Sequence, residues 1–305
     1  MGNDGKRVDA DVVRPQVRGW ALRVLIAAVA VLAVAAGVLA WRFALARPAG
    51  AKSAANPTAS ADSQPDHSRP PTTLTTTAPT AASASTTTTT TTSGPIRVLE
   101  IGDSLGVDLG EAMQSSWPST SVQLTMAARG DTGLTNSAYY DWPTVLSGLL
   151  ASIHPQVVVV LLGANDLQSM VTGSTVIAEG APGWNAAYAA RVTAIVSESV
   201  HAGAHVLWIG EPAMQDAFIN AGMTQLDAIA QGVVARYPGE AAYLSSNSVL
   251  APNGAFTFDA MGLTGQEVQV RTPDGVHLMP AGADLVAAAA ANALLTLWGM
   301  HVTGP

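Results

Sequence analysis

Cysteine is absent from this 305-residue chain, so disulfides, thiolate metal sites and a cysteine nucleophile are excluded. Aromatic residues make up 5% and charged residues 12%, and much of the 48% hydrophobic content is alanine and valine. From residue 96 onward there is no lysine, and five arginines are outnumbered by seventeen acidic residues. An acidic region without a basic stripe argues against binding nucleic acid or anionic lipid.

An uncharged apolar run lies near the N-terminus. It covers residues 24–41 (VLIAAVAVLAVAAGVLAW), between Arg23 and Arg42, and a run of this length is about enough to cross a hydrocarbon core of about 30 Å. Five lysine or arginine residues precede the run and three follow it closely, so the positive-inside rule places residues 1–23 in the cytoplasm. The sequence therefore predicts a single-pass signal anchor in the cell membrane, with everything after it outside the cytoplasm.

A cleaved signal peptide is the alternative. Ala44-Leu45-Ala46 has the small-x-small form of a processing site, and cleavage after Ala46 would secrete the rest of the chain. The anchor is favoured because the apolar run is longer than the ~7–15 residues usual for a signal peptide.

Residues 42–95 are rich in Thr, Ser, Ala and Pro and include seven consecutive threonines at 86–92. This composition cannot bury enough apolar area to fold, so a disordered linker is predicted. A bare spacer and an O-glycosylated stalk fit equally well.

Residues 96–305 alternate between strand-like and helix-like segments, which predicts one α/β domain. Strands are expected at 96–101, 122–126, 156–162, 205–210 and 241–244. Helices are expected at 105–116, 143–153, 184–202, 223–237 and 280–298, and a long polar loop at 168–183. Continuous apolar strands between helices predict a mainly parallel five-stranded sheet with helices on both faces, a three-layer α/β/α architecture. Active sites in such folds lie beyond the C-terminal ends of the strands.

Polar motifs follow these strands. Ser104 lies in the sequence GDSL directly after the first strand, where a tight turn would hold it near a helix N-terminus. Gly130 follows the second strand and Asn165 the third, and Asp274 and His277 lie just ahead of the last helix. Taken alone, the first motif also fits a helix N-cap serine, or the nucleophile elbow of the α/β-hydrolases. The elbow is rejected because the serine follows the first strand and the aspartate and histidine share one loop.

With these residues in this order, the chain resembles the SGNH or GDSL hydrolases from residue 96 to about residue 298. The resemblance implies a flavodoxin-like strand order and a serine hydrolase without metal or cofactor. It implies that Ser104 is the nucleophile, His277 the general base and Asp274 the residue that orients it. The oxyanion hole would consist of the backbone N–H groups of Ser104 and Gly130 and the side-chain amide of Asn165.

Other residues resemble one subgroup of these hydrolases, long catalogued only as a domain of unknown function. They are Asp141-Trp142-Pro143, Trp184 with Tyr188 and Arg191, residues 206–210, and Arg271 just ahead of Asp274. This closeness sharpens the fold and leaves the substrate open.

Three residues are candidates for substrate binding, namely Arg129, Trp184 and Arg271. Arg129 either contacts an anionic substrate group or forms a surface ion pair, and the sequence favours neither. Tryptophans are expected in the core, and Trp184 is the best candidate for an exception because it borders the long polar loop. Asp103 and Asp166 are expected to brace their own turns.

The expected activity is hydrolysis of an ester, a short acyl group such as O-acetyl on a carbohydrate or cell-envelope glycan, through an acyl-Ser104 intermediate. The glycan is inferred from location, because a tethered enzyme meets envelope polymers first. One alternative is an extracytoplasmic O-acyltransferase, which would pass the acyl group to a glycan hydroxyl and would need an acyl-donor protein in the membrane. The other is an inactive glycan-binding or scaffold module, against which the complete set of site residues argues.

Overall fold

The computed structural model describes residues 94–303 of the chain. The predicted cytoplasmic segment 1–23, the membrane anchor 24–41 and nearly all of the linker 42–95 lie outside the described residues. These three assignments therefore stay predictions from the sequence.

The centre of the domain is a five-stranded sheet in which every neighbouring pair is parallel. Its strands are β1 (Ile96–Gly102), β2 (Val122–Met126), β3 (Val157–Leu161), β6 (His205–Gly210) and β7 (Ala241–Ser245). They lie in the order β2-β1-β3-β6-β7, which is the flavodoxin-like order with the chain reversing direction across the sheet at β1 and β3. The predicted α/β fold and parallel five-stranded sheet are confirmed.

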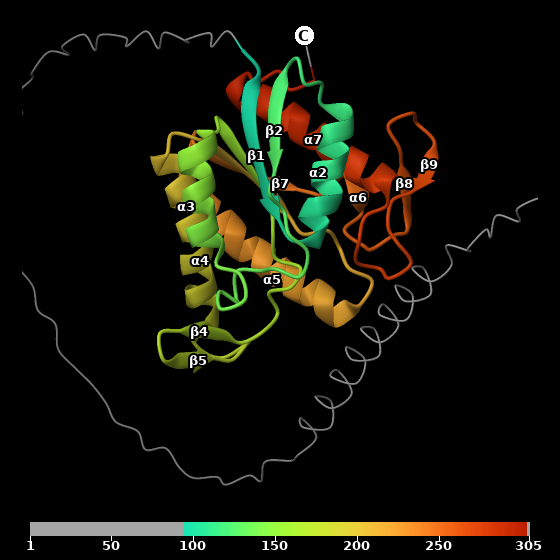
Figure 1. The fold of residues 1–305 in the computed structure, drawn as a ribbon. Helices are drawn as coiled ribbons and strands as arrows, with labels where there is room; N and C mark the ends of the chain where they lie inside the picture. Colours follow the sequence, from blue (N-terminus) through green and yellow to red (C-terminus); the bar gives the residue numbers. More distant parts are fainter. Residues whose placement is uncertain (1–93, 304–305) are drawn as a thin grey trace, which may run out of the picture. The chain divides into compact units, whose positions relative to one another are not determined.

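Helices cover both faces of this sheet. Figure 1 shows α2 (Ser104–Ser116) and α7 (Pro280–Trp298) on one face, and α3 (Trp142–Ile153), α4 (Trp184–His201) and α5 (Ala217–Val234) on the other. A short helix, α6 (Asn247–Leu250), follows β7. Because parallel strands are covered on both sides, they are apolar throughout, and all five residues of β3 (VVVVL) are buried.

The last helix, α7, is the one helix within residues 94–303 that is long and apolar enough to cross a membrane. Its small and aliphatic side chains, including Val286, Ala290 and Leu294, are instead buried against the rest of the domain. By its packing, α7 is a core helix of the α/β domain.

Two short antiparallel hairpins were not expected from the sequence. One, β4 (Met170–Thr172) with β5 (Thr175–Ile177), lies inside the segment predicted as a polar loop, and the other is β8 (Asp259–Met261) with β9 (Glu267–Gln269). Each strand has three residues, too few to show the alternation that marks a strand in a sequence.

Candidate active site

Ser104 is the first residue of α2 and directly follows the turn at the end of β1. Gly102 makes this turn possible, because a Cβ there would lie 2.3 Å from the Leu161 carbonyl oxygen and 2.7 Å from the Gly106 Cα. The side chain of Asp103 caps the helix by accepting a hydrogen bond from the Leu105 N–H at 3.0 Å. The serine hydroxyl is thereby fixed at the carboxyl edge of the sheet.

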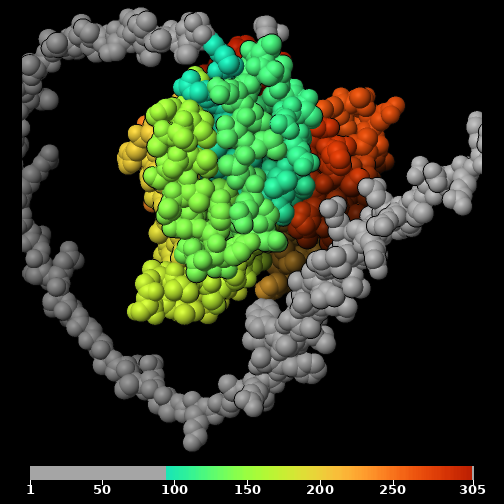
Figure 2. Space-filling model, viewed as in Figure 1, coloured from blue at the N-terminus to red at the C-terminus, as the bar shows by residue number. Residues whose placement is uncertain are grey.

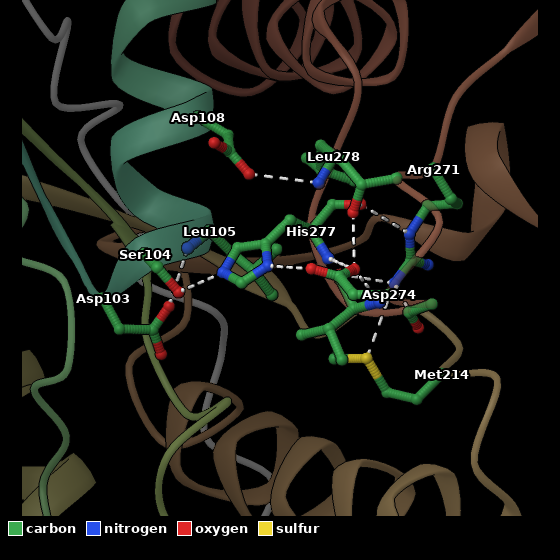
Figure 3. A network of polar contacts seen from close by, with 12 residues as sticks. Asp103, Ser104, Leu105, Asp108, Met214, Arg271, Asp274, His277 and Leu278 are labelled. Carbon is green, nitrogen blue, oxygen red and sulfur yellow. Dashed lines mark hydrogen bonds and ion pairs between the residues drawn. The ribbon is translucent and has the colours of Figure 1, made fainter. Parts of the chain in front are cut away.

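His277 and Asp274 meet Ser104 across 173 residues of sequence. His277 Nε2 lies 3.0 Å from the Ser104 Oγ, and its Nδ1 lies 2.7 Å from Asp274 Oδ2, as Figure 3 shows. These are the distances at which an imidazole can take the serine proton while a carboxylate holds its other nitrogen. The structure thus brings together the three residues that the sequence analysis assigns as nucleophile, general base and orienting acid.

Hydrogen bonds keep Asp274 ionised. Its Oδ1 accepts the N–H groups of Val276 (2.8 Å) and His277 (3.0 Å) and the hydroxyl of Thr272. Partial burial pushes the pKa of Asp274 upward, but these donors and the His277 ring outweigh it and hold that pKa well below its usual range. The carboxylate can therefore stabilise an imidazolium at His277.

Arg271 lies beneath this loop and holds it. Its guanidinium is 2% exposed and donates to the carbonyls of Ala213 (2.5 Å), Val276 (2.6 Å) and His277 (3.3 Å). Burial lowers the pKa of Arg271 to about 10. Because its donors are taken up by main-chain carbonyls, the structure corrects the sequence-based assignment of Arg271 as a substrate-binding candidate.

Gly130 and Asn165 face the same edge of the sheet. The Arg129 N–H donates to the Gly102 carbonyl at 2.8 Å, so the β1–β2 pairing continues past β2 and brings Gly130 beside the Ser104 turn. A Cβ at Gly130 would meet nothing within 4 Å, so this glycine borders open space. Asn165 Nδ2 donates to the Thr132 carbonyl at 2.9 Å, and the second amide proton stays available for an oxyanion.

Asp103 also ties the serine turn to the turn before Asn165. Its Oδ2 accepts the N–H groups of Gly163 (3.0 Å) and Ala164 (2.9 Å), and burial raises its pKa to about 6. Asp103 thus braces the relative positions of two predicted site elements, which agrees with its expected role.

Asp166 links the turn after β3 to two further segments. It accepts hydrogen bonds from the N–H groups of Leu134 and Thr135 and from the Tyr188 hydroxyl, and burial raises its pKa. It therefore braces the loop after β2 and contacts α4, whereas the sequence analysis expected it to brace its own turn.

Trp184 is a core residue. Its side chain is 0% exposed, its ring stacks on Tyr188 with centroids 5.3 Å apart, and its Nε1 donates to the Gln168 carbonyl at 2.9 Å. The hypothesis that Trp184 is a substrate platform is therefore corrected, because no face of the indole is open.

Asp108 was missed by the sequence analysis. It lies one helical turn after Ser104 on α2, and its Oδ2 accepts the Leu278 N–H at 3.0 Å, which joins the helix to the residue after His277 (Figure 3). Burial raises the pKa of Asp108. The available signal was its i+4 spacing from the serine, which places both residues on one face of the helix.

Metal ligands are not assembled in residues 94–303, where no group of three or more His, Cys, Asp or Glu side chains could hold an ion.

Comparison with known proteins identifies the family of this domain. The family model described as protein of unknown function (DUF459) matches residues 97–293, which confirms the subgroup expected from the sequence. No protein of curated function matches the chain.

Several solved structures are similar to the chain. One is the C-terminal catalytic domain of peptidoglycan O-acetyltransferase A from Streptococcus pneumoniae, with 18% identity, coverage of 70% of this chain and 99% of that chain, and a TM-score of 0.45. Another is a GDSL-like lipase from Bacteroides thetaiotaomicron, with 14% identity, coverage of 66% and 88%, and a TM-score of 0.45. A third is an acetyl-xylooligosaccharide esterase from Geobacillus Stearmophilus, with 12% identity, coverage of 65% and 94%, and a TM-score of 0.43. At such identities, the activity of this chain has to be argued from its own site residues.

Proposed function

The chain belongs to the family of proteins of unknown function DUF459, and from the geometry of its site we propose that it is a serine esterase of the SGNH type. The observation that carries the proposal is the chain of contacts from Ser104 Oγ to His277 Nε2 (3.0 Å) and from His277 Nδ1 to Asp274 Oδ2 (2.7 Å). A serine that only caps a helix does not need an imidazole at its hydroxyl. It also does not need an ionised carboxylate that holds the other nitrogen of that imidazole.

The proposed reaction has two halves. His277 Nε2 takes the hydroxyl proton as Ser104 Oγ attacks the ester carbonyl, and the resulting oxyanion is stabilised by the N–H groups of Ser104, Gly130 and Asn165. Each such donor typically contributes about 3 kcal/mol. Collapse expels the alcohol, which receives its proton from the imidazolium, and leaves an acyl-Ser104 ester. Water, deprotonated by His277, then attacks that ester and releases the acid.

The proposed substrate is a short acyl group, such as O-acetyl, on a carbohydrate or cell-envelope glycan. This part of the proposal is supported by the apolar run at 24–41 and the linker at 42–95, which would tether residues 96–305 outside the cytoplasm. A domain held near the membrane by a long linker reaches envelope polymers before other esters.

The test is hydrolysis of para-nitrophenyl acetate by the full-length protein in detergent, beside its Ser104→Ala variant. Turnover is expected for the wild-type protein and should disappear in the variant, while both show the same circular dichroism spectrum. A folded wild-type protein without Ser104-dependent turnover would contradict the proposal and favour a binding module.

A second arm adds an excess of a soluble oligosaccharide to the same reaction. For an esterase, the acetyl group should appear as acetate. Transfer of the acetyl group to sugar hydroxyls, detected by mass spectrometry, would instead identify the protein as an O-acyltransferase.

A further inference from the structure

Arg129 is the one arginine among the described residues whose guanidinium makes no hydrogen bond or ion pair. Within residues 94–303 there are no lysines and five arginines. The other four donate from the guanidinium to internal acceptors: Arg97 to His154, Arg191 to Leu134 and Val171, Arg236 to Thr193, and Arg271 to the loop that carries His277. Arg129 is exposed, and among the described residues its guanidinium has no hydrogen bond and no ion pair.

The position of Arg129 is nonetheless fixed. Its N–H donates to the Gly102 carbonyl at 2.8 Å and its carbonyl accepts the Thr132 hydroxyl at 2.6 Å. Its guanidinium carbon lies 5.0 Å from the centre of the Tyr140 ring, a cation–π distance. Tyr140 in turn packs edge-on against Trp142 at 4.9 Å between centroids. The cation is thus held on an aromatic support that leaves its N–H donors unpaired.

The backbone of Arg129 lies beside the proposed oxyanion hole. Arg129 directly precedes Gly130, and its backbone pairs with Gly102, two residues before Ser104. In Figure 2, the green part of the chain, which includes the loop after β2, lies at the surface of the domain. A substrate that places its carbonyl at the Gly130 N–H therefore meets the chain one residue from Arg129.

Because the domain is acidic overall, an arginine without an acidic partner indicates where an anionic group could bind. With five arginines against seventeen acidic residues from residue 96 onward, the domain as a whole does not attract anions. Recognition of an anionic ligand then requires a local cation, and a guanidinium presents donors whose geometry matches a carboxylate or a phosphate.

We propose that Arg129 is a specificity-determining residue that binds an anionic group, a carboxylate or a phosphate, on the alcohol part of the ester. This inference rests on the proposed esterase function and narrows its substrate to an acylated glycan that carries such a group near the esterified hydroxyl.

The experiment compares matched acetyl esters with the full-length protein. Meta-acetoxybenzoate carries a carboxylate where meta-acetoxybenzamide is neutral, and meta-acetoxyphenyl phosphate carries a phosphate. The readout is the ratio of kcat/KM for each anionic ester to that for the neutral ester, measured for the wild-type protein, Arg129→Gln, Arg129→Lys and Arg97→Gln. Arg97 is the matched control, because it lies at the start of β1, at the opposite edge of the sheet from Ser104.

The ratio for at least one anionic ester should fall about fivefold in Arg129→Gln, since an exposed charged pair contributes up to about 1 kcal/mol. The ratio should fall less in Arg129→Lys and stay at the wild-type value in Arg97→Gln. In the wild-type protein the ratio should also decrease as the salt concentration is raised, because salt screens the charges. Which anionic ester responds tells carboxylate from phosphate. Equal ratios in wild type and Arg129→Gln, with turnover that still needs Ser104, would overturn this inference alone and leave Arg129 as a packing partner of Tyr140. Loss of all Ser104-dependent turnover in the wild type would overturn the esterase function and this inference with it.

Discussion

The carboxylates around Ser104 fall into two groups with opposite environments. Asp274, in the loop of residues 272–278 that we call the triad loop, has a side chain that is 50% exposed and a pKa held below its usual range by hydrogen bonds. Asp103, on the other side of the serine, is buried, and burial raises its pKa to about 6. The comparison shows that the fold places the carboxylate needed for catalysis, Asp274, near water, where ionisation carries little desolvation cost.

Asp103 is one of four buried acids beneath the site, the others being Glu100, Asp166 and Glu211. Both carboxyl oxygens of Glu211 lack a protein hydrogen-bond partner among the described residues, and burial first, then neighbouring carboxylates, raises the pKa of Glu211 well above its ordinary value. A buried acid without a cation or several donors is most stable in its neutral form. The buried acids should therefore affect stability, and the triad loop should affect the reaction.

The largest effect expected from this division is that of Asp274→Asn. The asparagine oxygen can still accept the Val276 and His277 N–H groups, so the loop keeps its shape. Its NH₂ group would face His277 Nδ1, however, and would favour the tautomer that carries a proton on Nε2, which cannot accept the proton of Ser104. We expect kcat to fall about 10³–10⁴-fold, with only a small drop in melting temperature, because the lowered pKa shows that the ionised carboxylate stabilises the fold.

Steady-state kinetics and thermal unfolding on the same preparation check this prediction. Unchanged kcat would remove Asp274 from the mechanism. A large loss of stability would show that the triad loop and the buried acids do not differ as proposed.

Arg271→Met tests the support of the triad loop. The substitution removes the donors that hold the carbonyls of Ala213, Val276 and His277 and leaves these oxygens without their partner in a buried region. Unpaired buried groups typically cost about 1–3 kcal/mol each, so we expect the free energy of unfolding to fall by about 3 kcal/mol, and kcat to fall with it.

Urea unfolding measures the change in the free energy of unfolding, and ester hydrolysis measures the change in kcat. Arg271→Lys is the matched variant, because it keeps the charge but not the fork of donors, and it should recover only part of the loss. Wild-type stability in Arg271→Met would contradict the role assigned to this side chain.

Glu100 is expected to make the stability of the fold depend on pH. Its carboxyl is buried in β1, and burial raises its pKa from the model-peptide value of 4.5 to about 8. Between these two values the folded protein keeps a proton that the unfolded chain has released, so stability falls as the pH rises from 4.5 to about 8. Glutamine does not titrate and can still accept the Ala128 N–H. Glu100→Gln should therefore raise the melting temperature relative to wild type near the upper end of this range.

Thermal unfolding across the same pH range checks this, and the lower end of the range is the internal control, since both proteins are neutral at this position there. The difference in unfolding free energy should grow with pH and reach about 4–5 kcal/mol near the upper end of the range, since each pH unit between the two pKa values corresponds to about 1.4 kcal/mol. A difference that does not change with pH would show that Glu100 is ionised in the folded protein.

The sequence predicted the framework of this molecule closely. Strands and helices fell within a few residues of their observed bounds because continuous apolar segments alternate with helical periodicity. The largest error in a helix is at α5, which was expected from residue 223 but begins at Ala217. The missed signal was the N-cap, since Asp216 accepts the N–H groups of Phe218 and Ile219.

Roles that depend on the direction of a side chain were harder to predict. Trp184 and Arg271 lie beside loop and motif positions that suggested substrate contact, yet both are buried. A sequence gives the spacing of such residues but not which face of the chain turns inward. Ser104, His277 and Asp274 could be paired because their motifs follow strand ends and precede the last helix, and parallel strands bring those positions to one edge.

The smallest effect is expected at Asp108, which lies between the two regions. It belongs to α2, but its Oδ2 accepts the N–H of Leu278 in the triad loop at 3.0 Å. Asp108→Ala removes this acceptor, so His277 should be held less firmly, and we expect kcat/KM to fall about threefold to tenfold and stability by about 1 kcal/mol. Asp108→Asn keeps an acceptor at the same place without the charge, and should restore most of both. If the asparagine variant is as impaired as the alanine variant, the charge of Asp108 matters rather than its hydrogen bond, and the triad loop depends on a second carboxylate as well as on Asp274.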